Sequence, residues 1–328
     1  KHQIWIQRYT NSAIRDIDPL ISALSKDIAR LVKASDITPH DIHQIKAVEH
    51  DLERFVQGAV GEISQRVMQL SQELTEYEGD FTVRLLNRFL TVEMRGISPD
   101  ILYASVTQSP MRLVSGKKIK KLSIQEAVRQ FSTTAEKEIL DTIRSGAVMG
   151  RTPQQLTNDV SGMVKTRTKT QAHALVRTTT NHIASTAKEE IYRANADILD
   201  GERFTATLDS RTTLTCMGYD QQIFPVGSGP QPPVHWNCRS VRVPEVKQEY
   251  RVPGFETQRA SYEGPVSGRL TYDGFLRRQP KEFQDAVLGP ERGKLFRDGM
   301  PVKKFTDDLG RVLDLGQLKA MDERFSIP

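Results

Sequence analysis

The sequence predicts an α+β fold that is predominantly α-helical, and three observations lead to this prediction. Apolar residues recur with the 3.6-residue period of amphipathic helices over residues 11–105, 122–147 and 168–196. After residue 201 the spacing changes to the two-residue alternation of a half-buried strand. The length of 328 residues, with 38% hydrophobic and 27% charged side chains, is ordinary for a globular protein of about two domains.

Residues 1–110 are expected to form an all-α, bundle-like N-terminal region. One apolar stripe comprises Ile14, Ile17, Ile21, Leu24, Ile28, Leu31 and Val32, and a second comprises Ile45, Val48, Leu52, Phe55 and Ala59. A third helix is expected over residues 63–77, ended by the Glu-Gly-Asp of residues 78–80. Helices with short connections bury such stripes against one another. No pocket pattern occurs here, so an interaction or structural role is expected.

Residues 111–167 are expected to form a basic segment followed by connecting helices. The whole chain has a net charge of +5, and residues 1–100 carry −3. Residues 101–328 therefore carry +8. The candidate nucleic-acid contacts within this excess are Lys117, Lys118, Lys120, Lys121, Lys165, Arg167 and Lys169. Clustered positive charge favours phosphate-rich partners because binding releases counterions. A solvated surface segment is the alternative interpretation.

Residues 168–245 are expected to form a small α+β module with short antiparallel strands. A long helix over residues 168–196 precedes strands in 203–210, 221–226 and 240–244. A short helix through Cys216 would have Asp209 or Ser210 as its N-cap. Arg177 could instead bind Asp209 as a bidentate pair that fixes helix against strand; alternatively Asp209 only caps and Arg177 is only solvated.

The rest of the chain is expected to divide into two parts. Residues 246–270 are polar and rich in turn-forming residues, which predicts an extended arm or linker. Residues 271–328 regain the helical period and predict a helical C-terminal tail, in which Gly289 ends one helix and Pro290 begins the next.

Cys216, His235 and Cys238 have the spacing C-x18-H-x2-C and are candidate metal ligands. Zinc prefers these side chains, but the chain has no third cysteine, and Asp220 is the nearby oxygen candidate for a fourth ligand. A buried, hydrogen-bonded cluster without metal is an alternative. A nucleophilic Cys–His pair is another, and the His-Trp-Asn triplet also occurs in HNH-type nucleases. No oxyanion-hole pattern, second histidine or acidic partner stands at suitable spacing, so no catalytic residue is predicted.

Three motifs, taken in order, resemble the phage Mu F-like minor head protein family over roughly residues 170–244. They are HALVRTTTNHIASTAKEEIYRAN, TLDSRTTLTC, and PPVHWNCRS followed by VRVP. The motif positions match Arg177, Thr178, Asp209, Arg211, Thr212, Cys216, His235, Cys238 and Arg239. The tail FLRRQPKEFQDAVLGPERGKLFRDG is similar to that of one branch of phage minor head proteins. Members often carry Asp-Gly where this chain has Asp220 and Gln221.

The resemblance implies a structural, non-enzymatic role in the morphogenesis of the head of a tailed double-stranded DNA phage. It implies a place inside the virion head near the portal vertex after assembly in the bacterial cytoplasm, and a part in genome packaging or ejection. The implied partners are the portal protein, the major capsid or scaffolding protein, and packaged double-stranded DNA. Two cysteines in the whole chain are typical of a reducing compartment, and no apolar run long enough to span a membrane occurs. The alternative is a metal-dependent nuclease or a nucleic-acid-binding protein derived from one.

Overall fold

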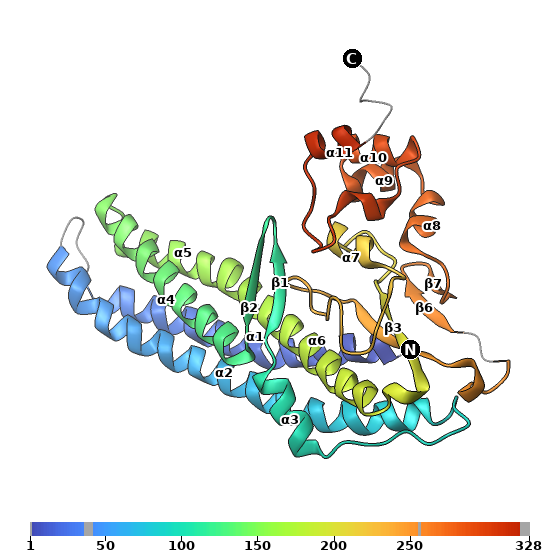
Figure 1. Cartoon of the computed structure of the whole chain (residues 1–328). Coiled ribbons are helices and arrows are strands. Elements are labelled where there is room, and N and C mark those ends of the chain that lie inside the picture. Colours follow the sequence, from blue (N-terminus) through green and yellow to red (C-terminus); the bar gives the residue numbers. More distant parts are fainter. Residues whose placement is uncertain (1, 36–41, 255–256, 322–328) are drawn as a thin grey trace. The chain divides into compact units, whose positions relative to one another are not determined.

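The computed structural model describes residues 2–35, 42–254 and 257–321, and it confirms a mostly helical α+β protein with small antiparallel sheets (Figure 1). The chain forms two compact units, each assembled from separate stretches of sequence. The helical unit contains residues 7–73 and 123–180. The mixed unit contains residues 1–6, 74–122 and 181–328. No helix among the described residues is both long and apolar enough to cross a membrane.

Long amphipathic helices build the helical unit. These are α1 (His2–Ala34), α2 (Ile42–Leu86), α4 (Ile124–Val148), α5 (Pro153–Met163) and, after a π-helical turn over Val164–Thr168, α6 (Lys169–Ala194). Helices α1, α2 and α6 each continue from one unit into the other. Six residues of the predicted stripe of α1 are buried, namely Ile14, Ile17, Ile21, Leu24, Ile28 and Val32, whereas Leu31 is half-buried. The predicted start at Thr152 is also confirmed, since its side chain forms a capping box with Gln155.

Helix α2 differs from its prediction in two respects. Phe55, predicted in the apolar stripe, is 44% exposed, while Leu52, Val56, Val60, Ile63 and Val67 are buried. The side chains of Ile45 and Val48 lie outside the described residues. The predicted break at residues 78–80 is wrong, since α2 continues to Leu86. Gly79 serves a close approach instead, because a β-carbon there would collide with the side chain of Leu102.

A three-stranded antiparallel sheet forms the centre of the mixed unit. Its order is β4-β3-β5, with β3 (Leu199–Thr205) between β4 (Ile223–Phe224) and β5 (Val241–Val246). Phe204 pairs with Arg242 across β3 and β5. The short helix α7 (Leu214–Tyr219) follows β3 and carries Cys216. The strands predicted in this module are therefore confirmed, although each is shorter than its predicted range or shifted along the chain.

Two β-hairpins stand where the sequence analysis placed other structure. The basic segment forms the hairpin of β1 (Met111–Ser115) and β2 (Lys118–Leu122). Its turn contains Gly116 with a φ of 60°, a conformation that favours glycine. The predicted extended arm includes the hairpin of β6 (Gln258–Ser261) and β7 (Gly264–Ser267). Alternating polarity is weak in both segments, so the two-residue period did not reveal them.

The C-terminal helices pack onto the module within the mixed unit. These are α8 (Tyr272–Arg277), α9 (Lys281–Leu288), α10 (Pro290–Arg297) and α11 (Leu315–Met321), while α3 (Pro99–Gln108) precedes the first hairpin. Their apolar core includes Phe275, Phe296 and Phe305 and extends to Leu208 and Met217 of the module. Gly289 ends α9 with a φ of 79°, and Pro290 begins α10, as predicted.

Candidate metal centre

The first turn of α7 positions Cys216. The N-cap is Thr213, whose hydroxyl accepts a hydrogen bond from the backbone N–H of Cys216 at 3.5 Å. The prediction that Asp209 or Ser210 caps this helix is therefore wrong. Cys216 is 1% exposed, among Phe204, Ala206 and Val234. Helix and apolar surroundings together fix the sulfur in place.

A tight turn positions His235 and Cys238. The backbone N–H of Cys238 donates to the carbonyl of His235 at 3.2 Å. Asn237 within the turn has a φ of 60°, a left-handed conformation that asparagine tolerates better than most residues. Asn181 of α6 donates to the carbonyls of Cys238 and Ser240 at 2.8 and 3.2 Å. The turn is thereby tied to the long helix.

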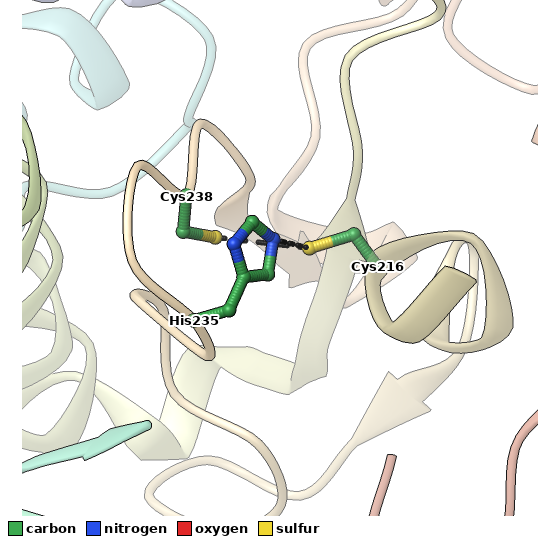
Figure 2. A group of neighbouring side chains, drawn as sticks. All are labelled: Cys216, His235 and Cys238. Atoms are coloured by element: carbon green, nitrogen blue, oxygen red, sulfur yellow. Dashed lines mark hydrogen bonds between the residues drawn. The ribbon is translucent and has the colours of Figure 1, made fainter. Parts of the chain in front are cut away.

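The three side chains converge, as Figure 2 shows. The Cys216 Sγ lies 3.1 Å from His235 Nε2 and 3.7 Å from Cys238 Sγ, and the three atoms lie within 4.8 Å of one another. Two thiolates on one tetrahedral zinc stand about 3.8 Å apart when each bond is about 2.3 Å. The sulfur separation therefore suits a single metal ion. These residues could hold a metal, as their spacing predicted.

The hydrogen bond of His235 Nδ1 determines which form of the ring Nε2 presents to the sulfurs. Nδ1 lies 2.8 Å from the carbonyl oxygen of Trp236, so the N–H at Nδ1 donates to that carbonyl. In the neutral ring Nε2 then carries no proton, and its lone pair points toward the sulfurs. A histidine ligand is commonly oriented in this way, with its other nitrogen bound to a carbonyl or carboxylate.

The pKa values within the cluster shift in opposite directions. Burial and the neighbouring Cys238 raise the pKa of the Cys216 thiol well above its usual value. Burial also acts to raise the pKa of Cys238, but the Cys216 thiol and the His235 ring outweigh it and hold this pKa well below the usual value. Burial acts to lower the pKa of His235, whereas the Cys238 charge raises it overall. The cluster thus favours a thiolate beside the imidazole, and a thiolate is the form of cysteine that binds metal.

Asp220, the oxygen candidate predicted from the sequence, serves a different purpose. Its carboxylate accepts bonds from Arg259 at 2.6 and 3.0 Å, and from the backbone N–H groups of Ala206 and Tyr272 at 2.9 and 2.7 Å. The side chains of Asp220 and Arg259 are 1% and 2% exposed. The prediction of Asp220 as a ligand is therefore wrong: it joins the module to the β6–β7 hairpin and α8.

Asp209 receives its bidentate arginine from the motif that also carries Cys238. Arg239 Nη2 donates to Asp209 Oδ1 at 2.8 Å, and Nη1 donates to Oδ2. The backbone N–H of Arg211 and the hydroxyl of Thr212 also donate to Asp209, at 3.0 and 3.3 Å. Arg239 therefore makes the bidentate contact with Asp209 that the sequence analysis considered for Arg177. Asp209 thus holds two motifs together.

Thr178 and Arg177 belong to the part of α6 that lies in the helical unit. Thr178 is fully buried, and its hydroxyl donates to the carbonyl of Ala174 at 2.7 Å. Arg177 is half-buried. Arg211 is exposed, and its guanidinium lies 3.8 Å from Asp209. Arg211 therefore lies outside the Cys–His cluster, and Thr178 is part of the buried framework of α6.

Besides the pair of Asp220 and Arg259, the sequence analysis missed a buried ion pair between two strands of the sheet. Arg242 Nε lies 3.2 Å from Glu202 Oε2, and these side chains are 2% and 0% exposed. Arg242 also donates to the carbonyl of Ser228 at 2.6 Å. Strand alternation places Glu202 on the same inward face as Phe204, which pairs with Arg242. Opposite charges at inward positions of neighbouring strands were the signal available in the sequence.

The predicted nucleic-acid-binding residues fall into two groups. Lys117, Lys118, Lys120 and Lys121 are exposed on the β1–β2 hairpin. Lys165, Arg167 and Lys169 lie at the π-helical turn and the start of α6, where Lys169 lies 3.1 Å from Asp18 and Arg167 lies 3.8 Å from Glu138. Carboxylates thus offset charge in the second group. In the first, Lys117 has Asp314 at 3.7 Å.

Comparison with protein families identifies the region that contains these motifs. Residues 137–243 match the family model described as phage Mu protein F-like protein. The chain contains a phage Mu protein F-like domain. This Mu F-like domain begins within α4, upstream of residue 168, where the module was predicted to start, and it includes every motif residue of the resemblance. Searches of curated proteins and of solved structures found no match.

Proposed function

We propose that the protein is a structural component of the head of a tailed double-stranded DNA phage and acts in head morphogenesis. The observation that carries this proposal is the Mu F-like domain over residues 137–243. The domain match shows kinship, and kinship in fold alone does not decide activity. The geometry of the motif residues supplies the second argument.

The motif residues hold the protein together rather than line a site that a substrate can enter. Cys216 and Cys238 are 1% and 2% exposed. Both carboxylate oxygens of Asp209 accept hydrogen bonds from Arg239. A nucleophile must be reachable by its substrate within hydrogen-bond distance of its base. Buried sulfurs favour a structural function over a catalytic one.

Within this function we place the protein inside the head, near the portal vertex, with the portal protein and the major capsid or scaffolding protein as partners. Helices α1 and α2 have 33 and 45 residues, which correspond to about 50 and 70 Å. Such helices offer long surfaces for docking. Assembly in the bacterial cytoplasm and a part in genome packaging or ejection belong to the same proposal.

Co-purification from infected cells tests this placement. The tagged chain is expected to co-purify with portal protein and with procapsids from cells that make the phage encoding it. Recovery of the full chain only among soluble proteins that are not in particles would contradict the proposal.

We further propose that packaged DNA is contacted mainly through the β1–β2 hairpin. Lys118, Lys120 and Lys121 are exposed, and among the described residues no carboxylate forms an ion pair with them. The major groove of B-DNA, about 12 Å wide, admits a two-stranded ribbon. Lysines on an edge strand also discourage strand pairing between molecules. DNA titration separates this protective role from binding.

Salt dependence of DNA binding is the measurement for the hairpin. Replacing Lys118, Lys120 and Lys121 with Gln should reduce the slope of log affinity against log salt by about 3, since each phosphate contact contributes about 0.9. The matched control replaces Lys165, Arg167 and Lys169 with Gln and should change the slope by less than about 1, because Asp18 and Glu138 offset charge there. A slope unchanged by the hairpin substitutions would return these lysines to the protective role.

The metal that suits the cluster in our proposal is zinc, with a structural role. The main alternative is a metal-dependent nuclease or a protein derived from one, centred on Cys216, His235, Cys238 and Arg239. Incubation of the purified protein with DNA and RNA, with zinc or with magnesium, distinguishes the two. Cleavage that disappears in His235→Ala but persists in the matched His50→Ala variant would overturn the structural interpretation.

A further inference from the structure

The cluster of Cys216, His235 and Cys238 supplies three ligands, whereas a closed structural zinc site has four. Asp220 is not available as the fourth, because Arg259 and two backbone N–H groups surround its carboxylate. A further donor must therefore come from another group beside the sulfurs. The immediate surroundings of Cys216 restrict the choice.

Two hydroxyls lie within hydrogen-bonding reach of the Cys216 sulfur, those of Ser240 and Thr213. Thr213 is the weaker candidate, because its hydroxyl already caps α7 by accepting the N–H of Cys216, and coordination of a metal would compete with that cap. Ser240 is 2% exposed and follows Cys238 by two residues. Asn181 holds the backbone of Ser240 by donating to its carbonyl at 3.2 Å. Ser240 is thus the oxygen donor that the fold fixes beside the cluster.

We propose that Cys216 Sγ, Cys238 Sγ, His235 Nε2 and the hydroxyl oxygen of Ser240 together hold one zinc ion. This inference rests on the structural zinc proposed above and names its fourth ligand. Two thiolates neutralise the charge of Zn²⁺, and a neutral imidazole and hydroxyl complete the tetrahedron. A buried set of charges is tolerated when it is neutral and its ligands are hydrogen-bonded.

The surroundings of the ligands support a metal. The backbone N–H of Val234 donates to the Cys238 sulfur, and the Nδ1–H of His235 donates to the Trp236 carbonyl at 2.8 Å. Such outer contacts orient metal ligands and are part of the site. The three ligand side chains come from α7 and from one turn, so a zinc ion would join two separate stretches of the module.

The same Val234 connects the cluster to the basic hairpin. Its carbonyl accepts the backbone N–H of Val114 in β1 at 2.7 Å. A two-stranded hairpin is marginally stable without support. A metal ion in the site should therefore stabilise the hairpin as well. Protection of the Val114 amide from hydrogen exchange measures this stabilisation. This readout is independent of any function in the phage.

The test is zinc binding by the full chain, purified under reducing conditions and titrated against a competing chelator. Wild type should bind one zinc per chain. Ser240→Ala should bind zinc more weakly, and Ser240→Cys, which supplies a thiolate, more tightly, each by at least about tenfold, the lower end of what outer contacts alone contribute. The matched controls are Ser210→Ala and Ser210→Cys, because Ser210 is exposed in the same module and both should match wild type.

Cobalt substitution identifies the ligands directly. The Co²⁺ form of Ser240→Cys should show stronger sulfur-to-metal absorption than wild type, whereas Cys238→Ser should show weaker absorption. Val114 protection should fall when zinc is removed from wild type. Circular dichroism identifies any variant that fails to fold.

Two results would overturn the inference. The first is a folded wild type that takes up no zinc. The second is zinc affinity that is equal in wild type, Ser240→Ala and Ser240→Cys, which would assign the fourth position to another donor. Neither result depends on co-purification with portal protein, so failure of the metal site and failure of the proposed function are distinguishable.

Discussion

The two units of the molecule are stabilised by different means. In the helical unit the apolar stripes of long helices are buried, and ion pairs such as Arg30–Asp27 lie exposed on the surface. In the mixed unit the Arg259–Asp220 and Arg242–Glu202 pairs lie inside, with every side chain at most 2% exposed. Strands of two to seven residues bury little apolar area. Buried ion pairs therefore add directional contacts to the apolar core of the mixed unit, whereas the ion pairs of the helical unit named here stay at its surface.

The largest expected effect comes from breaking a buried ion pair. Asp220→Asn leaves Arg259 buried without its counter-charge and should lower the free energy of unfolding by about 3–5 kcal/mol. Asp27→Asn is the matched control in the helical unit and should change it by less than about 0.5 kcal/mol, because the Arg30 pair is exposed. Urea unfolding of both variants measures the difference. Equal effects would remove the contrast between the units.

The converse effect is expected in the helical unit. Ile28 is fully buried on α1, and Ile28→Ala should destabilise the protein by about 3 kcal/mol through lost apolar contact and a cavity. Phe55→Ala removes a larger side chain that is 44% exposed and should cost less than about 1 kcal/mol. The order of the two unfolding midpoints checks the observed stripe of α2, and the reverse order would favour the stripe predicted from sequence.

A smaller effect is expected from the geometry of one arginine. Arg239→Lys keeps the charge but loses the bidentate contact with Asp209, and should destabilise the protein by about 1–2 kcal/mol. Arg211→Lys is the matched control, because that guanidinium is 75% exposed, and should be nearly neutral. Unfolding in urea at pH 7 compares the two variants. Similar losses of stability would contradict a special contribution of the bidentate contact between Arg239 and Asp209.

The same pair predicts how stability depends on pH. Burial acts to raise the pKa of Asp209, but the hydrogen bonds and charge of Arg239 outweigh it and hold the pKa below the usual 3.8. A carboxyl whose pKa is lower in the folded state stabilises above its unfolded pKa and loses that contribution as the pH falls through the folded value. In Arg239→Gln, the free energy of unfolding should fall less than in wild type when the pH is lowered below about 4. Urea unfolding measured from pH 6 downward tests this, and an unchanged slope would contradict it.

The smallest expected effect is a gain in stability. The turn after α7 forms although Gln221 stands where family members often have glycine: Gln221 has a φ of 65°, and the N–H of Gln222 donates to the carbonyl of Tyr219 at 3.0 Å. Gln221→Gly should relieve this conformation and stabilise the protein by about 1 kcal/mol, less what the 3.0 Å bond from Arg203 contributes. Asn237→Gly should gain less, since asparagine tolerates a positive φ. Thermal unfolding of both variants provides the comparison.

Sequence patterns predicted the parts of the molecule whose stability depends on local periodicity. The α1 stripe, the capped start of α5 and the convergence of Cys216, His235 and Cys238 were all accessible, because each depends on spacing along the chain. Arg259 was not, since its partner Asp220 lies 39 residues away. Gly79 was interpreted as a helix end, although it permits the approach of Leu102. Long-range pairing and close packing leave little local pattern.

The most direct test of the central claim is whether this chain is a component of the phage head. If the chain has the proposed role, purified heads of the phage that encodes it, separated from tails and soluble protein, should contain the chain. Quantitative mass spectrometry of heads and of the soluble fraction makes the measurement. Absence from heads, with the chain recovered only in the soluble fraction, would contradict the structural role proposed here.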